Sequence, residues 1–209
     1  MADRPYHDRN RGRSYRRSSD RPDRPVYQEP SAIIIDLHED LLPKGTRGGE
    51  YRRHYPVLVV VGAKKFTVQK VYLKHQLNVA VGDIIDLTQH KDDFITTKRH
   101  PASDWSVGLR DLVEEMVAQL LRENEEQYVQ FFNNAKLITT KLHQLKLLPG
   151  VGEKRVSKIL KTRDMKPFES YADIEERVGI DPVAVVTARV LEELEEPQRY
   201  HLFTVPVGQ

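Results

Sequence analysis

The interpretation of this chain starts from residues 147–156, which read LLPGVGEKRV. This stretch lies between two segments of helical periodicity and is typical of a helix-hairpin-helix motif, which we expect over residues 139–161 with helices at about 139–148 and 153–161. Pro149 ends the first helix because it lacks an N–H group, and Gly150 and Gly152 allow positive φ. The next helix then begins with exposed N–H groups, which bind a phosphate oxygen without any side chain.

Basic side chains follow the hairpin immediately. Lys154, Arg155 and Lys158 can neutralise flanking phosphates. We therefore predict a nucleic-acid-binding site that also includes the hairpin residues Pro149, Gly150, Val151 and Gly152. A hairpin of this kind contacts one backbone and reads little base sequence. The alternative is a glycine-terminated helix turn with no ligand.

Composition limits the possible classes of protein. The 209 residues are 39% hydrophobic and 31% charged, with a net charge of only +2. Because cysteine is absent, the sequence excludes disulfides, thiolate zinc sites and a cysteine nucleophile. No apolar run approaches the ~20 residues of a membrane span, so we expect a cytoplasmic protein that does not enter membranes.

The first 30 residues are rich in Arg, Asp, Ser, Pro and Tyr and nearly lack aliphatic side chains. Such a segment cannot bury enough surface to offset its ordering entropy, so we expect a disordered tail over residues 1–30. Arginine with interspersed tyrosine binds phosphates and stacks on bases, which predicts RNA contact. The predicted contact residues are Arg11, Arg13, Arg16 and Arg17. A solubilising tail, or one that pairs with an acidic protein, is the alternative.

Residues 31–100 have the pattern of β-structure. Short β-branched runs occur at residues 32–37, 57–61, 66–73, 79–87 and 94–97. Five strands of this length predict a small β-barrel of the OB or SH3 kind. A one-sided sheet covered by the following helices is the competing arrangement.

A basic, glycine-rich and aromatic loop spans residues 44–55. With the nearby lysines it predicts a groove along a nucleic-acid backbone, with Tyr51 and Tyr55 as stacking platforms. The residues assigned to it are Tyr51, Arg52, Arg53, Lys64 and Lys65. An ordinary hairpin loop with solvated charges remains open as an alternative.

From residue 101 to 209 the periodicity is helical, so the fold class is α+β, a small barrel followed by an all-α helix-hairpin-helix bundle. Apolar residues at i, i+3 and i+4 spacing begin at Leu109, and a second helix begins near Glu125. Residues 171–194 form a degenerate second hairpin that lacks the Gly-x-Gly pattern, with Pro182 at the first helical position. Residues 199–205 are predicted as a strand that returns to the barrel.

Residues 124–204 resemble an uncharacterised archaeal family, a conserved domain of unknown function usually described as nucleotide- or RNA-binding. The residues that carry the resemblance lie at 124–125, 131–133, 138–143, 145–152, 168–174 and 189–194. The resemblance implies an OB-like barrel fused to a helix-hairpin-helix bundle, a cytosolic setting and a link to translation or rRNA. Two residues depart from the usual motif: Val156 replaces a small residue, and Glu153 would oppose an approaching phosphate.

The sequence offers no catalytic constellation and no metal or cofactor site. Its best interpretation is a non-catalytic RNA-binding protein associated with rRNA or ribosomal subunits, with tail, barrel and hairpin as linked weak sites. A DNA-binding or repair accessory factor is one alternative. A metal-dependent nucleic-acid enzyme that uses acidic turns such as Asp83 and Asp86 is another.

Overall fold

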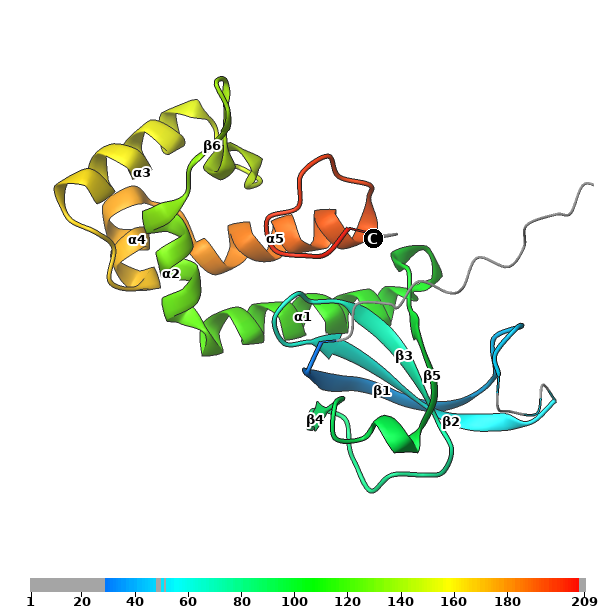
Figure 1. Ribbon diagram of the computed structural model, residues 1–209. Coiled ribbons are helices and arrows are strands. Elements are labelled where there is room, and N and C mark those ends of the chain that lie inside the picture. Colours follow the sequence, from blue (N-terminus) through cyan, green and yellow to red (C-terminus); the bar gives the residue numbers. More distant parts are fainter. Residues whose placement is uncertain (1–28, 48–49, 51, 207–209) are drawn as a thin grey trace, which may run out of the picture.

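The chain is α+β, with a curled antiparallel five-stranded half-barrel sheet followed, in the part of the chain that the structure describes, by five α-helices (Figure 1). The structure is a computed structural model that describes residues 29–206 except residues 48, 49 and 51. Several predicted contact residues therefore lie outside the described residues: Arg11, Arg13, Arg16, Arg17 and Tyr51.

The five predicted strands all form, in the sheet order β4-β1-β2-β3-β5 with antiparallel pairing throughout. They are β1 (Ser31–Leu41), β2 (His54–Gly62), β3 (Val68–Leu73), β4 (Ile84–Asp86) and β5 (Phe94–Arg99). The fourth strand is much shorter than the predicted 79–87, because Gly82 has φ +94° and turns the chain just before it. The 3₁₀ turns η1 (Lys91–Asp93) and η2 (Ala102–Asp104) flank β5.

Both faces of the sheet are buried, against different partners. Along β1, Ile33 and Ile35 pack with the helices, whereas Ala32 and Ile34 face a separate cluster inside the curl of the sheet. This alternation follows from the two-residue period of a strand. Among the described residues β4 and β5 remain the two edges of the sheet, so the structure combines a half-barrel with a helix-covered face.

Helix α1 lies across the sheet, and α5 packs alongside α1 (Figure 1). The helices are α1 (Val107–Glu123), α2 (Glu125–Asn134), α3 (Glu153–Met165), α4 (Tyr171–Val178) and α5 (Pro182–Glu195). The predicted stripe on α1 is confirmed at its centre, where Val113, Val117 and Leu121 are fully buried. One continuous core therefore joins the sheet to the helical region.

The predicted helix at residues 139–148 was wrong. The segment instead forms the two-stranded hairpin β6 (Leu137–Thr139) and β7 (Leu142–His143), followed by the 3₁₀ turn η3 (Gln144–Leu147). The β-branched Thr139 and Thr140 favour strand and turn over helix. Leu145 and Leu148 are buried as predicted, but their spacing of three residues fits the three-residue turn of a 3₁₀ helix.

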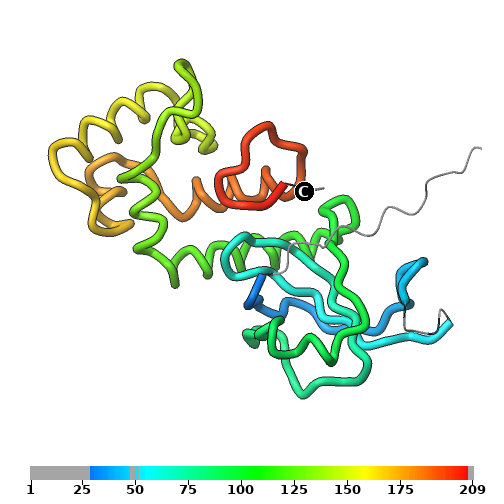
Figure 2. The backbone as a smooth tube through the Cα atoms, viewed as in Figure 1, coloured from blue at the N-terminus to red at the C-terminus, as the bar shows by residue number. Residues whose placement is uncertain are grey.

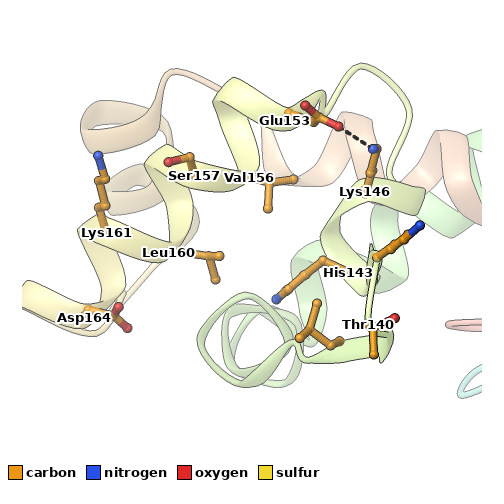
Figure 3. A pocket seen from close by; sticks show the side chains of 11 residues that line it. Thr140, His143, Lys146, Glu153, Val156, Ser157, Leu160, Lys161 and Asp164 are labelled. Atoms are coloured by element: carbon orange, nitrogen blue, oxygen red, sulfur yellow. Dashed lines mark hydrogen bonds and ion pairs between the residues drawn. The ribbon is translucent and has the colours of Figure 1, made fainter.

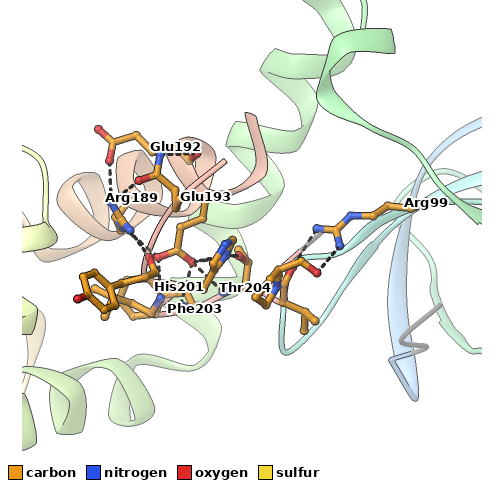
Figure 4. A network of polar contacts seen from close by, with 12 residues as sticks. Arg99, Arg189, Glu192, Glu193, His201, Phe203 and Thr204 are labelled. Atoms are coloured by element: carbon orange, nitrogen blue, oxygen red, sulfur yellow. Dashed lines mark hydrogen bonds and ion pairs between the residues drawn. The ribbon is translucent and has the colours of Figure 1, made fainter. Parts of the chain in front are cut away.

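The predicted return strand at 199–205 was also wrong, although this segment does reach the sheet. The buried Glu193 carboxylate accepts hydrogen bonds from the backbone N–H groups of Leu202 (2.7 Å) and Thr204 (3.0 Å) and from Arg189 Nε (2.9 Å) (Figure 4). Arg99 Nη2 of β5 donates to the carbonyl of Val205 at 3.1 Å. The backbone N–H and C=O groups of this segment therefore bond to charged side chains and not to a neighbouring strand. Hydrogen bonds to charged groups are stronger than those between neutral groups.

Candidate nucleic-acid interface

The first hairpin, residues 148–152, is a tight turn closed by its own backbone. The N–H of Val151 donates to the carbonyl of Leu148 at 3.0 Å, and Gly150 has φ +75°. Proline at the second position and a left-handed glycine at the third are the pattern of a type II turn. Arg155 Nη1 donates to the carbonyl of Gly150 at 2.6 Å, which fastens the first turn of α3 to the hairpin.

Gly152 is the N-cap of α3 and leaves the end of the helix open. Its backbone is extended, with φ −76° and ψ 177°, so the prediction of positive φ there was wrong. A Cβ built on Gly152 would find no atom within 4 Å, so the surrounding chain does not require glycine. No side chain caps this helix, and its first N–H groups lack intrahelical acceptors.

The charged residues at the start of α3 differ in the partners that they have within the described chain. Lys154 is exposed and makes no hydrogen bond or ion pair with the described part of the chain. Glu153 accepts from Lys146 Nζ at 2.7 Å, and this bond and charge lower the pKa of the Glu153 carboxyl. Lys158 donates to the carbonyl of Val178 at 2.9 Å, so its ammonium connects α3 to the end of α4. Of the two lysines predicted beside the hairpin, Lys154 is the one without a side-chain partner among the described residues.

A groove of about 460 Å³, here called the α3 groove, lies between the β6–β7 hairpin and α3 (Figure 3). It is lined by Leu137, Thr140, Lys141, His143, Lys146, Glu153, Val156, Ser157, Leu160, Lys161 and Asp164. Val156, which replaces the usual small residue, lines this groove, and no first α-helix covers it. Sequence reasoning missed the groove because it treated the β6–β7 hairpin as a helix; the β-branched run at 138–140 was the available signal.

The predicted basic loop lies far from the first hairpin. The β1–β2 connection and the α3 region stand at opposite ends of the molecule (Figures 1 and 2). Arg52 and Arg53 are exposed, but Tyr55 is only 8% exposed and its hydroxyl accepts the N–H of Glu50 at 2.9 Å. Tyr55 is a residue of β2 and packs in a small buried cluster, so its predicted role as a stacking platform was wrong.

Lys64 and Lys65 belong to a turn built round a buried acid. The Glu29 carboxylate accepts the backbone N–H groups of Lys64 (2.6 Å), Lys65 (2.8 Å) and Thr67 (3.1 Å). Gly62 lets this carboxylate approach the backbone closely, because a Cβ there would lie 2.0 Å from a Glu29 oxygen. The turn is thus shaped by Glu29, and the structure does not bring these lysines together with the first hairpin.

The sequence and the fold both match known proteins. Residues 28–205 match the family described as a protein of unknown function, DUF655. The chain belongs to the DUF655 family. It is 30% identical over 152 residues to the uncharacterized protein MJ0038 of Methanocaldococcus jannaschii, which covers 71% of this chain and 70% of that protein. The crystal structure of Af1531 from Archaeoglobus fulgidus, of the same family, is 32% identical, with a TM-score of 0.70 over 85% of this chain and 100% of that one.

The acidic turns of this DUF655 chain are occupied by local hydrogen bonds. Asp86 Oδ1 accepts from the N–H of Thr88 at 2.8 Å, and Asp83 Oδ2 accepts from the N–H of Ala80 at 2.8 Å. Within the described residues no group of three or more His, Asp or Glu side chains is placed to hold a metal ion. In the same residues, no helix combines the length and apolar character needed to cross a bilayer.

A second cavity, of about 520 Å³, lies between η2 and the end of α5. Trp105 Nε1 donates to the carbonyl of His100 at 3.0 Å, and Arg99 is committed to the C-terminal segment. The exposed Glu195 and Glu196 line the same cavity. The Trp105 and Arg99 donors already have carbonyl partners, and the two carboxylates would repel a phosphate. The α3 region of the DUF655 fold therefore remains the candidate interface.

Proposed function

We propose that this protein binds RNA without catalysis and holds one phosphate of the backbone at the N-terminus of α3. The observation that carries the proposal is the open helix end at Gly152. A glycine that the fold does not require leaves the first N–H groups of α3 accessible, and beside them lies Lys154, which has no side-chain partner within residues 29–206 as far as the structure describes them. A helix N-terminus with free N–H groups and an adjacent cation is a phosphate-binding arrangement.

Two further features support RNA as the nucleic acid. The strand order β4-β1-β2-β3-β5 is compatible with a partly open five-stranded barrel of the OB kind, a fold that binds oligonucleotides. The Arg-rich sequence of residues 1–28 supplies guanidinium groups with interspersed tyrosines, which suit single-stranded RNA. We propose rRNA in ribosomal subunits as the target, in the cytoplasm.

A DNA-binding accessory factor is the second candidate. It is favoured by the hairpin itself, because contact through backbone N–H groups reads phosphates and not the sugar or the bases. Binding to duplex DNA that equals or exceeds binding to RNA would select this candidate.

The test in cells is sucrose-gradient sedimentation of native lysate followed by ultraviolet crosslinking and sequencing of bound RNA. The proposal predicts co-migration with ribosomal subunits and crosslinks to rRNA, and both should decline in a Gly152→Asp variant. Migration at the top of the gradient without RNA crosslinks would contradict it.

A further inference from the structure

The α3 groove has an apolar floor that the folded chain leaves uncovered. Val156 and Leu160 of α3 are half-buried, whereas Leu137 of β6 is 64% exposed along the opposite side. Apolar surface that gathers in one concave place, with polar groups round it, is typical of a ligand site.

Ammonium groups surround this floor. Lys141 and Lys161 line the groove and make no side-chain hydrogen bond or ion pair with other residues that the structure describes. Lys146 lies where α3 begins and donates to Glu153 (Figure 3). Because Asp164 is the only other acid in the lining, the lining carries more positive than negative charge. An anion is the complementary ligand.

His143 adds a directional donor. Its Nδ1 accepts the N–H of Leu145 at 3.2 Å, which places the proton of a neutral ring on Nε2. Burial, with a smaller contribution from the charge of Arg163, lowers the pKa of His143 below 6.5, so the ring is neutral at physiological pH. A neutral imidazole N–H can donate to a carbonyl or a ring nitrogen.

We infer that the α3 groove takes an unstacked base of single-stranded RNA, while the adjoining phosphate lies at the N-terminus of α3. The inference rests on the proposed function and names its substrate class. Glu153 belongs both to the groove and to the first turn of α3, so the two subsites are contiguous. The groove volume of about 460 Å³ lies within the range of about 300–1,000 Å³ typical of small-molecule pockets.

The chemistry of the groove distinguishes a single strand from a duplex. The aliphatic floor covers the face of a base, and the lysines neutralise the phosphates on either side of it. In a duplex the bases are stacked and paired, so none can enter without being extruded at an energetic cost. Preference for single strands is therefore a property of the apolar floor of the groove, whereas affinity for phosphate comes from the first hairpin and the groove lysines together.

The test is fluorescence anisotropy of the full chain with three labelled probes of equal length. The probes are an oligouridine, the same strand with abasic sites in its central part, and an RNA duplex. We expect the oligouridine to bind about ten-fold more tightly than the abasic strand, as contacts to a base typically provide. The abasic strand keeps the phosphates, so it measures the phosphate contacts of the hairpin and the groove lysines without the contact to a base.

Two variants alter the groove and one serves as a matched control. Leu137→Ser removes an exposed apolar wall, and Ser157→Glu introduces a negative charge at an exposed groove position of α3. Met165→Ser removes an 85% exposed side chain from the end of the same helix, outside the groove lining. Both groove variants should bind oligouridine and abasic strand alike, whereas Met165→Ser should retain the ten-fold difference.

The outcomes separate this inference from the proposed function. Equal affinity of the wild-type chain for oligouridine and abasic strand would overturn the base-binding groove and leave the phosphate site intact. Equal affinity for duplex and single strand would overturn it as well. Absence of binding to all three probes would overturn the proposed function, and the groove inference with it.

Discussion

The two hairpins of the helical region align residue by residue and differ in how the following helix begins. Gly150 and Gly179 have φ +75° and +79°, and the next residues, Val151 and Ile180, are both buried. The third position is Gly152 in the first hairpin and Asp181 in the second hairpin, residues 178–181. The two hairpins therefore share their left-handed turn and their buried aliphatic residue.

The difference lies in the N-cap. At the N-terminus of α5, Asp181 Oδ1 accepts the N–H of Ala184 at 3.0 Å, and Pro182 has no N–H group. The chain itself therefore reduces the number of free N–H groups at this helix end. Gly152 supplies no cap to α3. The fold tolerates either choice, so a capping side chain is not needed for α3 to form. A phosphate would complete α3 as Asp181 completes α5.

The largest expected effect comes from making the first hairpin resemble the second. Gly152→Asp places a carboxylate where the phosphate is proposed to bind. RNA affinity should fall about ten-fold or more, or ~1.4 kcal/mol. The free energy of unfolding should stay equal or rise by a few tenths of a kcal/mol, since aspartate caps a helix slightly better than glycine.

Anisotropy and thermal unfolding of the same preparation measure both quantities. Gly152→Ala is the control, because it adds a Cβ without charge at a position where a Cβ contacts nothing within 4 Å. It should bind RNA more tightly than Gly152→Asp. Loss of stability in Gly152→Asp, or unchanged affinity, would contradict the account. Gly150→Ala is a poor probe because its φ of +75° strains any side chain.

The second effect concerns the closed hairpin. Asp181→Ala removes the bond to Ala184 and should lower the free energy of unfolding by about 1 kcal/mol. Its affinity for RNA should not change, because the second hairpin is not proposed to bind phosphate. Urea unfolding with parallel anisotropy tests both. A fall in affinity without a loss of stability would show that the second hairpin also contacts RNA.

Substitutions of two lysines of α3 are expected to have smaller effects, one on RNA binding and the other on stability. Lys154→Ala should weaken RNA binding by about three-fold and reduce the salt slope, log Kd against log salt, by ~0.7 for one lost phosphate contact. Lys158→Ala should leave that slope unchanged and lower stability, because it loses the bond to the carbonyl of Val178. A smaller salt slope in Lys158→Ala, with an unchanged slope in Lys154→Ala, would contradict the proposed position of the phosphate.

The smallest expected effect concerns how the free energy of unfolding depends on pH. The residue responsible is His143, which precedes the first hairpin in the sequence. Because burial lowers the pKa of His143 in the folded chain, the unfolded chain takes up a proton first on acidification. The contribution of neutral His143 to the free energy of unfolding is complete above pH 6.5. It declines as the pH falls from 6.5 toward the pKa of His143 in the folded chain. A His143→Asn variant, which keeps an acceptor for Leu145, should lose less stability than wild type between about pH 7.5 and about pH 5.5. An identical loss in both proteins would refute the assignment.

Local sequence signals predicted most of the fold. The β-branched runs located all five strands. The cap of α4 is of the same local kind, because the Oγ of Ser170 accepts the N–H of Asp173, three residues along the chain, at 3.1 Å. Gly150 was correctly expected to adopt positive φ. These features depend on neighbouring residues, whose chemistry is visible in the sequence.

The remaining features depend on contacts between distant residues. Glu29 binds a turn 35 to 38 residues away, and the α3 groove exists only because β6 and β7 fold against α3. Lys158 donates to a carbonyl 20 residues along the chain, a contact that the sequence did not predict. Periodicity and composition contain no record of such pairs, so the sequence alone could not separate Lys154 from Lys158.

The most direct test of the central claim is a ¹H–¹⁵N NMR titration of the full chain with a short single-stranded RNA. The account predicts that the amide signals of Glu153, Lys154 and Arg155 at the start of α3 shift strongly, while those of Val183 and Ala184 at the start of α5 do not. Shifts of equal size at both helix ends, or shifts confined to the β1–β2 loop, would contradict it.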